Sequence, residues 1–504
     1  MRLLRVSISW PIALVDGIAV RKITISAGGL LGAVVLGWYI AKGEIGLPAM
    51  VAGILGLWIA SRVTRIRADA LVTGAVVAGY LVGNRGFAQL HFPSVPLLPG
   101  EAALGLGLTL MLWRAAKNQT LPVRRDALNL LLILWLLIGA VRLPMDFRIH
   151  QFSALRDFAM VYYALFFFVA QDWADLVRER RWVQHCLLGG VALTAPIFMI
   201  FSFWPGWFLV KLTVFGTPLI FVKSDVAGGF MAAGVIWFAH QFARTRRFGW
   251  LALCAVSLVG LVLCNSRAAL VALVAAVAWL LVLRAWPTLR VLGLLVALAF
   301  LGLVIHAAVS PRSFATTPLY RIYESVASVA DVSGTRTYRA GDLGDKPDNN
   351  QFRLVWWRTV IDRTWVEGRW LGLGFGHDLA ADFLQIYYGE ATEDFTARSP
   401  HSFLLSIFGR MGGVGFAILL AILTAIAIRT WRAGRHEGRA EPGSEPVLPL
   451  WIGAWAIFIS ACFGVVLESP MGAVVFWTML GLANGLSHQT REEDDTVEPP
   501  AGEP

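Results

Sequence analysis

Charged residues are scarce in this sequence. Asp, Glu, Lys and Arg make up 15% of its 504 residues, whereas a soluble globular protein carries about 25%. Hydrophobic residues make up 57%, and the mean hydropathy is +0.64. Apolar stretches long enough to cross a hydrocarbon core of roughly 30 Å recur between residues 24 and 487. Because helices satisfy their own backbone hydrogen bonds in lipid, the sequence predicts an all-α fold, a polytopic transmembrane helix bundle.

Cysteine is also rare, and motifs for metals and nucleic acids are missing. The four cysteines lie inside apolar stretches or at their edges: Cys186, Cys254, Cys264 and Cys462. This placement offers no cysteine pair for a soluble disulfide framework or a zinc site. The formal charge of +10 does not indicate nucleic-acid binding, because the chain has neither a basic domain nor a recognition motif.

The apolar stretches predict about 12–14 membrane spans. The fourteen candidates are 24–41, 46–61, 69–84, 97–113, 126–143, 156–171, 184–203, 226–243, 249–264, 267–284, 290–309, 401–428, 449–467 and 470–487. They divide the chain into a first set of spans within 1–309, a large loop at 310–400, the C-terminal spans at 401–487, and an acidic tail at 488–504. The tail is rich in charge and proline, so we expect it to be disordered.

The distribution of positive charge predicts the orientation of these spans. If the N-terminus is cytoplasmic, nineteen lysines and arginines fall in the loops on that side and eight in the opposite short loops. The positive-inside rule therefore places both termini in the cytoplasm and the large loop outside.

Few positive residues face outward in this topology, so each needs a physical reason. Arg156, Arg267 and Arg353 all lie near helix ends on the outer face. Snorkelling explains a single arginine at an interface. Three on one face indicate an anionic ligand, because a guanidinium group binds phosphate oxygens bidentately. Arg358 and Arg398 are further candidates on the same face.

The large loop has two recognisable segments. Its apolar residues between Phe352 and Trp365, which include Trp356 and Trp357, recur at helical spacing. They predict an amphipathic helix on the membrane surface, with its indoles at headgroup level. The following GLGFGHD, residues 372–378, lacks the glycine spacing of a dinucleotide loop, and we expect a turn that returns the chain to the bundle.

A histidine begins the next apolar stretch, in the sequence RSPHSF. Ser399 is a suitable N-cap and Pro400 suits the first helical position, so we expect His401 in the first turn of a helix. The unpaired amide groups there and the neighbouring Arg398 disfavour imidazolium. The pattern predicts a neutral His401 that accepts a proton, although a hydrogen-bonded interfacial histidine without chemistry would have the same sequence.

Arg410 follows His401 in the same predicted span. Nine residues at 1.5 Å each place it about 13 Å deeper along the helix. A charge at that depth faces a polar cavity or a partner, and Glu468 is a candidate partner.

Four motifs together resemble the O-antigen ligase and polymerase family. They are NSRAALVAL from residue 265, FRLVWW from 352, GLGFG from 372 and PHSFLLSIFGRMGGVG from 400, and the resemblance covers roughly residues 220–430. Two positions depart from the family pattern: Ser402 stands where asparagine is frequent, and Arg410 stands where an acidic residue is common.

The resemblance implies an activity and a role for several residues. Members of the family transfer glycans from undecaprenyl diphosphate on the periplasmic side of the bacterial inner membrane, without metal or nucleotide. Arg267 and Arg353 correspond to diphosphate-binding arginines, Arg156 is a softer match, and His401 corresponds to the catalytic histidine. The implied partners are the lipid-linked glycan donor, membrane lipids and an acceptor.

Three functions remain open at this point. A ligase passes the glycan to a lipid A core or a protein, whereas a polymerase passes it to a second lipid-linked glycan. A lipid or polysaccharide transporter without chemistry is less favoured, because most charges lie at span ends and no twin pair of broken helices is visible.

Overall fold

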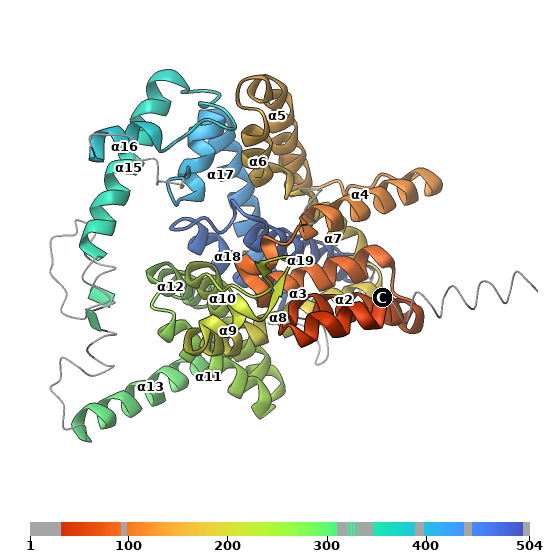
Figure 1. Ribbon diagram of the computed structural model, residues 1–504, viewed down its shortest axis with the longest axis vertical. Helices are drawn as coiled ribbons and strands as arrows, with labels where there is room; N and C mark the ends of the chain where they lie inside the picture. Colours follow the sequence, from red (N-terminus) through yellow and green to blue (C-terminus); the bar gives the residue numbers. More distant parts are fainter. Residues whose placement is uncertain are drawn as a thin grey trace, which may run out of the picture.

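The computed structural model describes residues 32–91, 98–309, 346–388, 398–437 and 446–496, with single positions between 320 and 331. The predicted all-α fold is confirmed. In this part of the chain the sheet is confined to β1 (Thr213–Val214) and β2 (Thr217–Pro218), which pair antiparallel with Thr213 opposite Pro218. The helices surround a common centre formed by α10, α18 and α19 (Figure 1).

The helices fall into two groups along the chain. The first group is α2 (Gly46–Thr64), α3 (Ala68–Ala88), α4 (Pro99–Asn118), α5 (Ala127–His150), α6 (Phe152–Tyr162), α7 (Leu165–Ala174), α8 (Val177–Phe203) and α9 (Pro205–Val210). The second group is α10 (Ser224–Thr245), α11 (Phe248–Leu263), α12 (Arg267–Val282), α13 (Trp286–Val309), α15 (Lys346–Glu367), α16 (Ala381–Tyr388), α17 (Phe403–Glu437), α18 (Leu448–Ala461) and α19 (Pro470–Thr496).

Many of these helices are suited to a membrane. Within the described residues, seven helical stretches are long and apolar enough to cross one: Gly46–Thr64, Ala127–His150, Phe152–Ala174, Val177–Phe203, Ser224–Thr245, Trp286–Val309 and Phe403–Glu437. Shorter apolar helices lie at Gly32–Ala41, Phe248–Leu263, Arg267–Val282 and Leu448–Ala461. Each predicted span overlaps a helix, and the protein is a multi-pass membrane protein. A total of about 12–14 spans stays a prediction.

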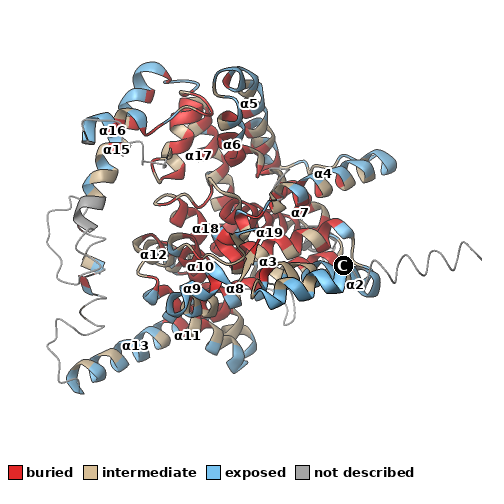
Figure 2. Cartoon of the chain, viewed as in Figure 1, coloured by how far each residue is buried: buried red, intermediate tan, exposed pale blue. Residues whose placement is uncertain are grey.

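Burial separates central from peripheral helices. α10 and α19 are buried along most of their lengths, and α18 is buried at nearly every position. α13 is buried only at Thr288, Val291 and Leu292 near its start, and the rest of it extends from the bundle as an exposed apolar helix (Figure 2). Exposed apolar helices of this kind are stable only in a lipid environment.

Loops that we predict to be cytoplasmic meet at one end of the bundle. Arg67 and Arg114 each bridge Asp69 and Asp172, with nitrogen-to-oxygen distances of 2.6–2.9 Å. Asp69 is fully buried and also accepts from the Trp173 indole at 3.1 Å. These contacts join α3, α4 and α7 through their predicted cytoplasmic ends.

Two further clusters close the same end. Asp126, the N-cap of α5, is 2.9 Å from His488 Nε2 and 3.5 Å from Arg429 Nη2. Glu437 is 2.9 Å from Arg244. These contacts bring together several helix ends that the charge count assigns to one side, whereas the topology and the side of the membrane stay predictions.

In the described part of the large loop, α15 packs against α17 and α16 packs against α15. α15 confirms the predicted helix, but part of its apolar face is buried within the protein. Trp356 is fully buried and stacks on Phe383 of α16 with ring centroids 4.9 Å apart, whereas Trp365 is 54% exposed. Trp356 is therefore enclosed by protein, because Phe383 of α16 and the His401 ring contact it, and the membrane depth of its indole stays a prediction.

The C-terminal boundary also differs from the prediction. α19 continues to Thr496, so the predicted end of the last span at 487 lies within a helix. His488 extends the packed part of this helix through its contact with Asp126. Residues 497–504 of the predicted disordered tail lie outside the described residues.

Candidate functional site

His401 lies in a turn just before α17. The helix begins at Phe403, and the Ser402 carbonyl accepts from the Ser406 amide at 2.9 Å. His401 has φ +54°, in the left-handed region. The predicted position in the first helical turn is therefore wrong, because a residue in this conformation cannot continue a right-handed helix.

Two tryptophans of α15 define the surroundings of this turn. The Trp356 ring meets the His401 ring edge to face, with centroids 5.8 Å apart. The Trp357 indole donates to the Pro400 carbonyl at 2.7 Å. Both contacts place the imidazole beside α15, the helix that carries Arg353.

The imidazole is held neutral. Burial lowers the pKa of His401 to about 4, with further contributions from the positive charges of Arg353 and Lys223, while Asp225 opposes them. We predicted neutrality from the helix terminus and Arg398, but burial, Arg353 and Lys223 cause it. A neutral imidazole at neutral pH can accept a proton.

Asp225 offsets the charge of Arg353 only at a distance. Its Nη1 donates to the Phe463 carbonyl at 3.0 Å, and no carboxylate among the described residues lies within ion-pair distance of it. Burial and the nearby charge of Arg267 lower the pKa of Arg353, whereas Asp225 raises it. A guanidinium group in this situation is suited to bind an anionic ligand.

Arg267 is the first residue of α12, after the N-cap Ser266. Its Nη1 donates to Asn350 Oδ1 at 2.6 Å, and the Asn350 amide donates to the Asp331 carbonyl at 2.7 Å. Asn350 and Arg353 are one turn apart on α15, so Arg267 and Arg353 meet at the same part of that helix. The structure thus brings together three predicted site residues, His401, Arg267 and Arg353.

Lys223 and Asp225 belong to the same group, although sequence reasoning did not select them. They lie at the start of α10, with Lys223 Nζ 3.3 Å from Asp225 Oδ2. Asp225 acts electrostatically on both His401 and Arg353. The sequence signal that could have identified Lys223 was its position just before an apolar span on the predicted outer side. Basic residues are common at the ends of membrane spans, so this position is not specific to a binding site.

Arg410 belongs to a second, buried group. It pairs with Asp157 of α6 at 2.6 Å and donates to the His377 carbonyl at 3.1 Å. Asp157 also accepts from the Gly376 amide at 3.0 Å. Glu468, the predicted partner, instead accepts from Ser406 and acts on Arg410 only at longer range.

Arg156 and Arg398 lie with this second group. Arg156 is 3.7 Å from Asp157, with 66% of its side chain exposed, and Arg398 donates to the Gly376 carbonyl. Both act electrostatically on Arg410. Arg358 joins neither group, because its side chain is 85% exposed and faces Asp362 at 3.6 Å.

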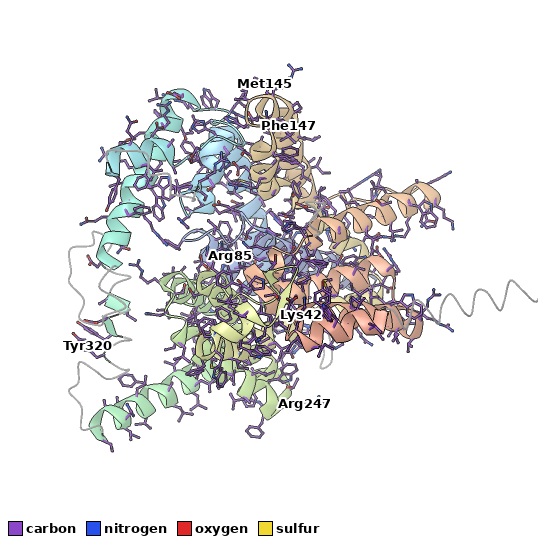
Figure 3. The ribbon with its side chains drawn as sticks, viewed as in Figure 1. Lys42, Arg85, Met145, Phe147, Arg247 and Tyr320 are labelled. Carbon is purple, nitrogen blue, oxygen red and sulfur yellow. The ribbon has the colours of Figure 1, made fainter. Side chains whose placement is uncertain are left out.

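The glycine-rich segment is the predicted turn. Gly372, Gly374 and Gly376 have φ values of +77°, +106° and +86°, which side chains would disfavour. Arg142 of α5 donates to the carbonyls of Leu371 and Gly372, and so ties this turn to the bundle. The same end of α5 carries the exposed Met145 and Phe147, which project from the bundle (Figure 3).

The described residues contain no group of three or more His, Cys, Asp or Glu side chains arranged to hold a metal ion. The candidate site comprises His401, Arg353, Arg267, Lys223 and Asp225.

A family model described as O-antigen ligase matches residues 252–420. The chain contains an O-antigen ligase domain. The match includes Arg267, Arg353 and His401, and it confirms the resemblance that the motifs indicated. The match supports a membrane enzyme of the O-antigen ligase and polymerase type, a family that implies glycosyltransferase-like activity. No curated protein matches the sequence closely enough to add a relative.

Proposed function

We propose that this O-antigen ligase-type enzyme transfers a glycan from undecaprenyl diphosphate to an acceptor hydroxyl, on the periplasmic face of the bacterial inner membrane. One observation carries the proposal: a neutral His401 lies beside Arg353, whose charge no described carboxylate neutralises at ion-pair distance. A proton acceptor next to a free guanidinium group is what displacement of a diphosphate requires.

The arginines would bind the donor. The Arg353 and Arg267 guanidinium groups can each present two N–H donors to phosphate oxygens. Lys223 supplies a third positive charge, which Asp225 partly offsets at 3.3 Å. These positive side chains are already in position when the reaction begins. They stabilise the negative charge that develops on the departing diphosphate.

The transfer itself is a single displacement. The acceptor oxygen attacks the anomeric carbon and forms the new glycosidic bond. The bond between that carbon and the diphosphate oxygen breaks, and its electron pair leaves on undecaprenyl diphosphate. His401 takes the hydroxyl proton, and attack from the face opposite the leaving group inverts the anomeric configuration.

His401→Ala tests the proposed base. We expect transfer to fall by about 10²- to 10⁴-fold, because general-base assistance is worth that much. The assay combines purified protein, lipid-linked glycan and acceptor without ATP, and it measures covalent product by mass spectrometry. Binding of the donor should persist in the variant, since the arginines are unchanged.

The same assay separates the alternative functions. Covalent product formed by the wild-type protein excludes a transporter without chemistry. Two acceptors, a lipid A core and a second lipid-linked glycan, distinguish a ligase from a polymerase. Full activity of His401→Ala would remove the histidine from the mechanism.

A further inference from the structure

The segment between α18 and α19 contacts three parts of the candidate site. The Phe463 carbonyl accepts from Arg353 at 3.0 Å, and the Phe463 ring lies 6.4 Å from the Trp357 ring. Gly464 is so close to Asp225 that an added Cβ would lie 3.0 Å from its Oδ2. This segment therefore supports Arg353 and Asp225 from one side.

Glu468, in the same segment, reaches the histidine turn. Its Oε1 accepts from the Ser406 hydroxyl at 2.7 Å, and the Ser406 hydroxyl is 3.2 Å from that of Ser399. Ser399 precedes His401 by two residues, and Ser406 lies on the first turns of α17. Ser406 is fully buried, so water does not compete for this hydrogen bond. The carboxylate and the two hydroxyls therefore link both sides of the turn.

The turn needs such support because of its backbone. A non-glycine residue rarely adopts the left-handed conformation of His401, at φ +54°. Strained backbone of this kind persists only where surrounding contacts hold it. From α15 the Trp357 indole holds the Pro400 carbonyl, and the chain from Glu468 through Ser406 to Ser399 holds the opposite side.

We propose that Glu468 is a positioning residue for His401, acting through hydrogen bonds to Ser406 and Ser399. The proposal rests on the glycosyl transfer proposed above. Glu468 does not touch the imidazole. It keeps the ring beside Arg353, where the acceptor proton is to be taken.

Two substitutions distinguish positioning by hydrogen bonds from a purely electrostatic role. Glu468 also acts electrostatically on Arg410, so removal of its charge alone must be tested separately. Glu468→Gln retains an oxygen that accepts from Ser406 and loses the charge. Glu468→Ala loses both. Ser469→Ala is the matched control, because the Ser469 hydroxyl bonds the Val465 carbonyl within its own segment.

We expect Glu468→Ala to lower kcat by about tenfold or more while the KM for the lipid-linked donor stays unchanged. As the pH is lowered, the kcat/KM of Glu468→Ala should begin to fall at a higher pH than that of the wild type. In the wild type the site charges that face His401 are Arg353, Lys223 and Asp225, and the pKa is about 4. A displaced imidazole returns toward its ordinary pKa of about 6.5. Glu468→Gln and Ser469→Ala should stay within about threefold of the wild type.

A second measurement does not depend on activity. Diethyl pyrocarbonate modifies neutral imidazoles, and mass spectrometry gives the rate at His401. We expect this rate to rise several-fold in Glu468→Ala and to stay unchanged in Glu468→Gln. Absence of transfer by the wild type would contradict the proposed function, whereas the modification rates would still test the positioning role.

Three results would overturn the proposal. In the first, Glu468→Ala has the wild-type pH dependence of kcat/KM below neutrality and the wild-type rate of His401 modification. In the second, kcat falls equally in Glu468→Gln and Glu468→Ala. In the third, Glu468→Ala changes only the KM for the donor.

Discussion

Arginines at the two ends of this bundle have opposite surroundings. At the predicted cytoplasmic end, Arg67 and Arg114 share the carboxylates of Asp69 and Asp172 at 2.6–2.9 Å. At the other end, Arg353 bonds a backbone carbonyl and lies near a second arginine and a neutral histidine. The first arrangement joins helices, and the second leaves positive charge available for a ligand.

This comparison shows that residue type alone does not identify a functional arginine. An ion pair uses the guanidinium charge within the fold, so little remains for an anion. A desolvated guanidinium group without a carboxylate is costly to bury, and function is one reason for a protein to keep it. The buried Arg410 has Asp157 at 2.6 Å and therefore belongs with the structural group.

The largest expected effect is the loss of turnover when Arg353 is replaced, which replacement of Arg114 at the other end should not cause. Arg353→Ala should lower kcat/KM by about 10²- to 10³-fold, as loss of one preorganised donor does elsewhere. Arg114→Ala should destabilise the fold by about 1–2 kcal/mol through loss of its charged hydrogen bonds, with near-normal turnover per folded molecule. Initial rates and thermal unfolding in detergent measure both. The contrast fails if Arg114→Ala abolishes turnover in folded protein and Arg353→Ala only destabilises it.

An intermediate effect concerns pH. The pKa of His401 is lowered to about 4, so the base stays unprotonated as pH falls from neutrality until it approaches that value. We expect kcat/KM, which reports the free enzyme, to stay level down to about pH 5 and to fall below it. A profile of initial rates at constant ionic strength provides the measurement. The ordinary pKa of histidine is about 6.5. A fall in kcat/KM centred near that pH would show that His401 is not the desolvated base.

The smallest effect is expected at Arg358. Its side chain is 85% exposed and lies on the same helix as Arg353. Arg358→Ala should change stability by less than about 0.5 kcal/mol, as surface substitutions usually do, and should leave turnover unchanged. It is the matched control for Arg353→Ala. A large loss of donor binding in this variant would restore Arg358 to the diphosphate site.

Sequence patterns predicted the helices well and the details of the site less well. Apolar length identified the spans, because the thickness of the hydrocarbon core sets that length whatever the tertiary contacts are. Serine and proline before His401 suggested a helix start three residues too early, at Pro400 instead of Phe403, since the same residues also occur in turns. The turn is instead held by Trp357 and Ser406, whose positions depend on packing.

Ion-pair partners were the least predictable feature. We predicted Glu468 as the partner of Arg410, because a charge about 13 Å deep in a span requires a polar partner. Asp157 takes that place because α6 packs near α17 and the glycine-rich turn, and no sequence spacing records this proximity. Lys223 and Asp225 were missed for the same reason.

The sequence by itself determined that this protein is a multi-pass helical bundle and which family motifs it carries. These properties depend on hydrophobicity, charge counts and local residue order, which act along the chain. Only the tertiary structure decided which arginines are neutralised, what lowers the pKa of His401, and that Glu468 accepts a hydrogen bond from Ser406 beside its turn. Those properties depend on desolvation and on charges a few ångströms apart, which distant segments create only when they pack together.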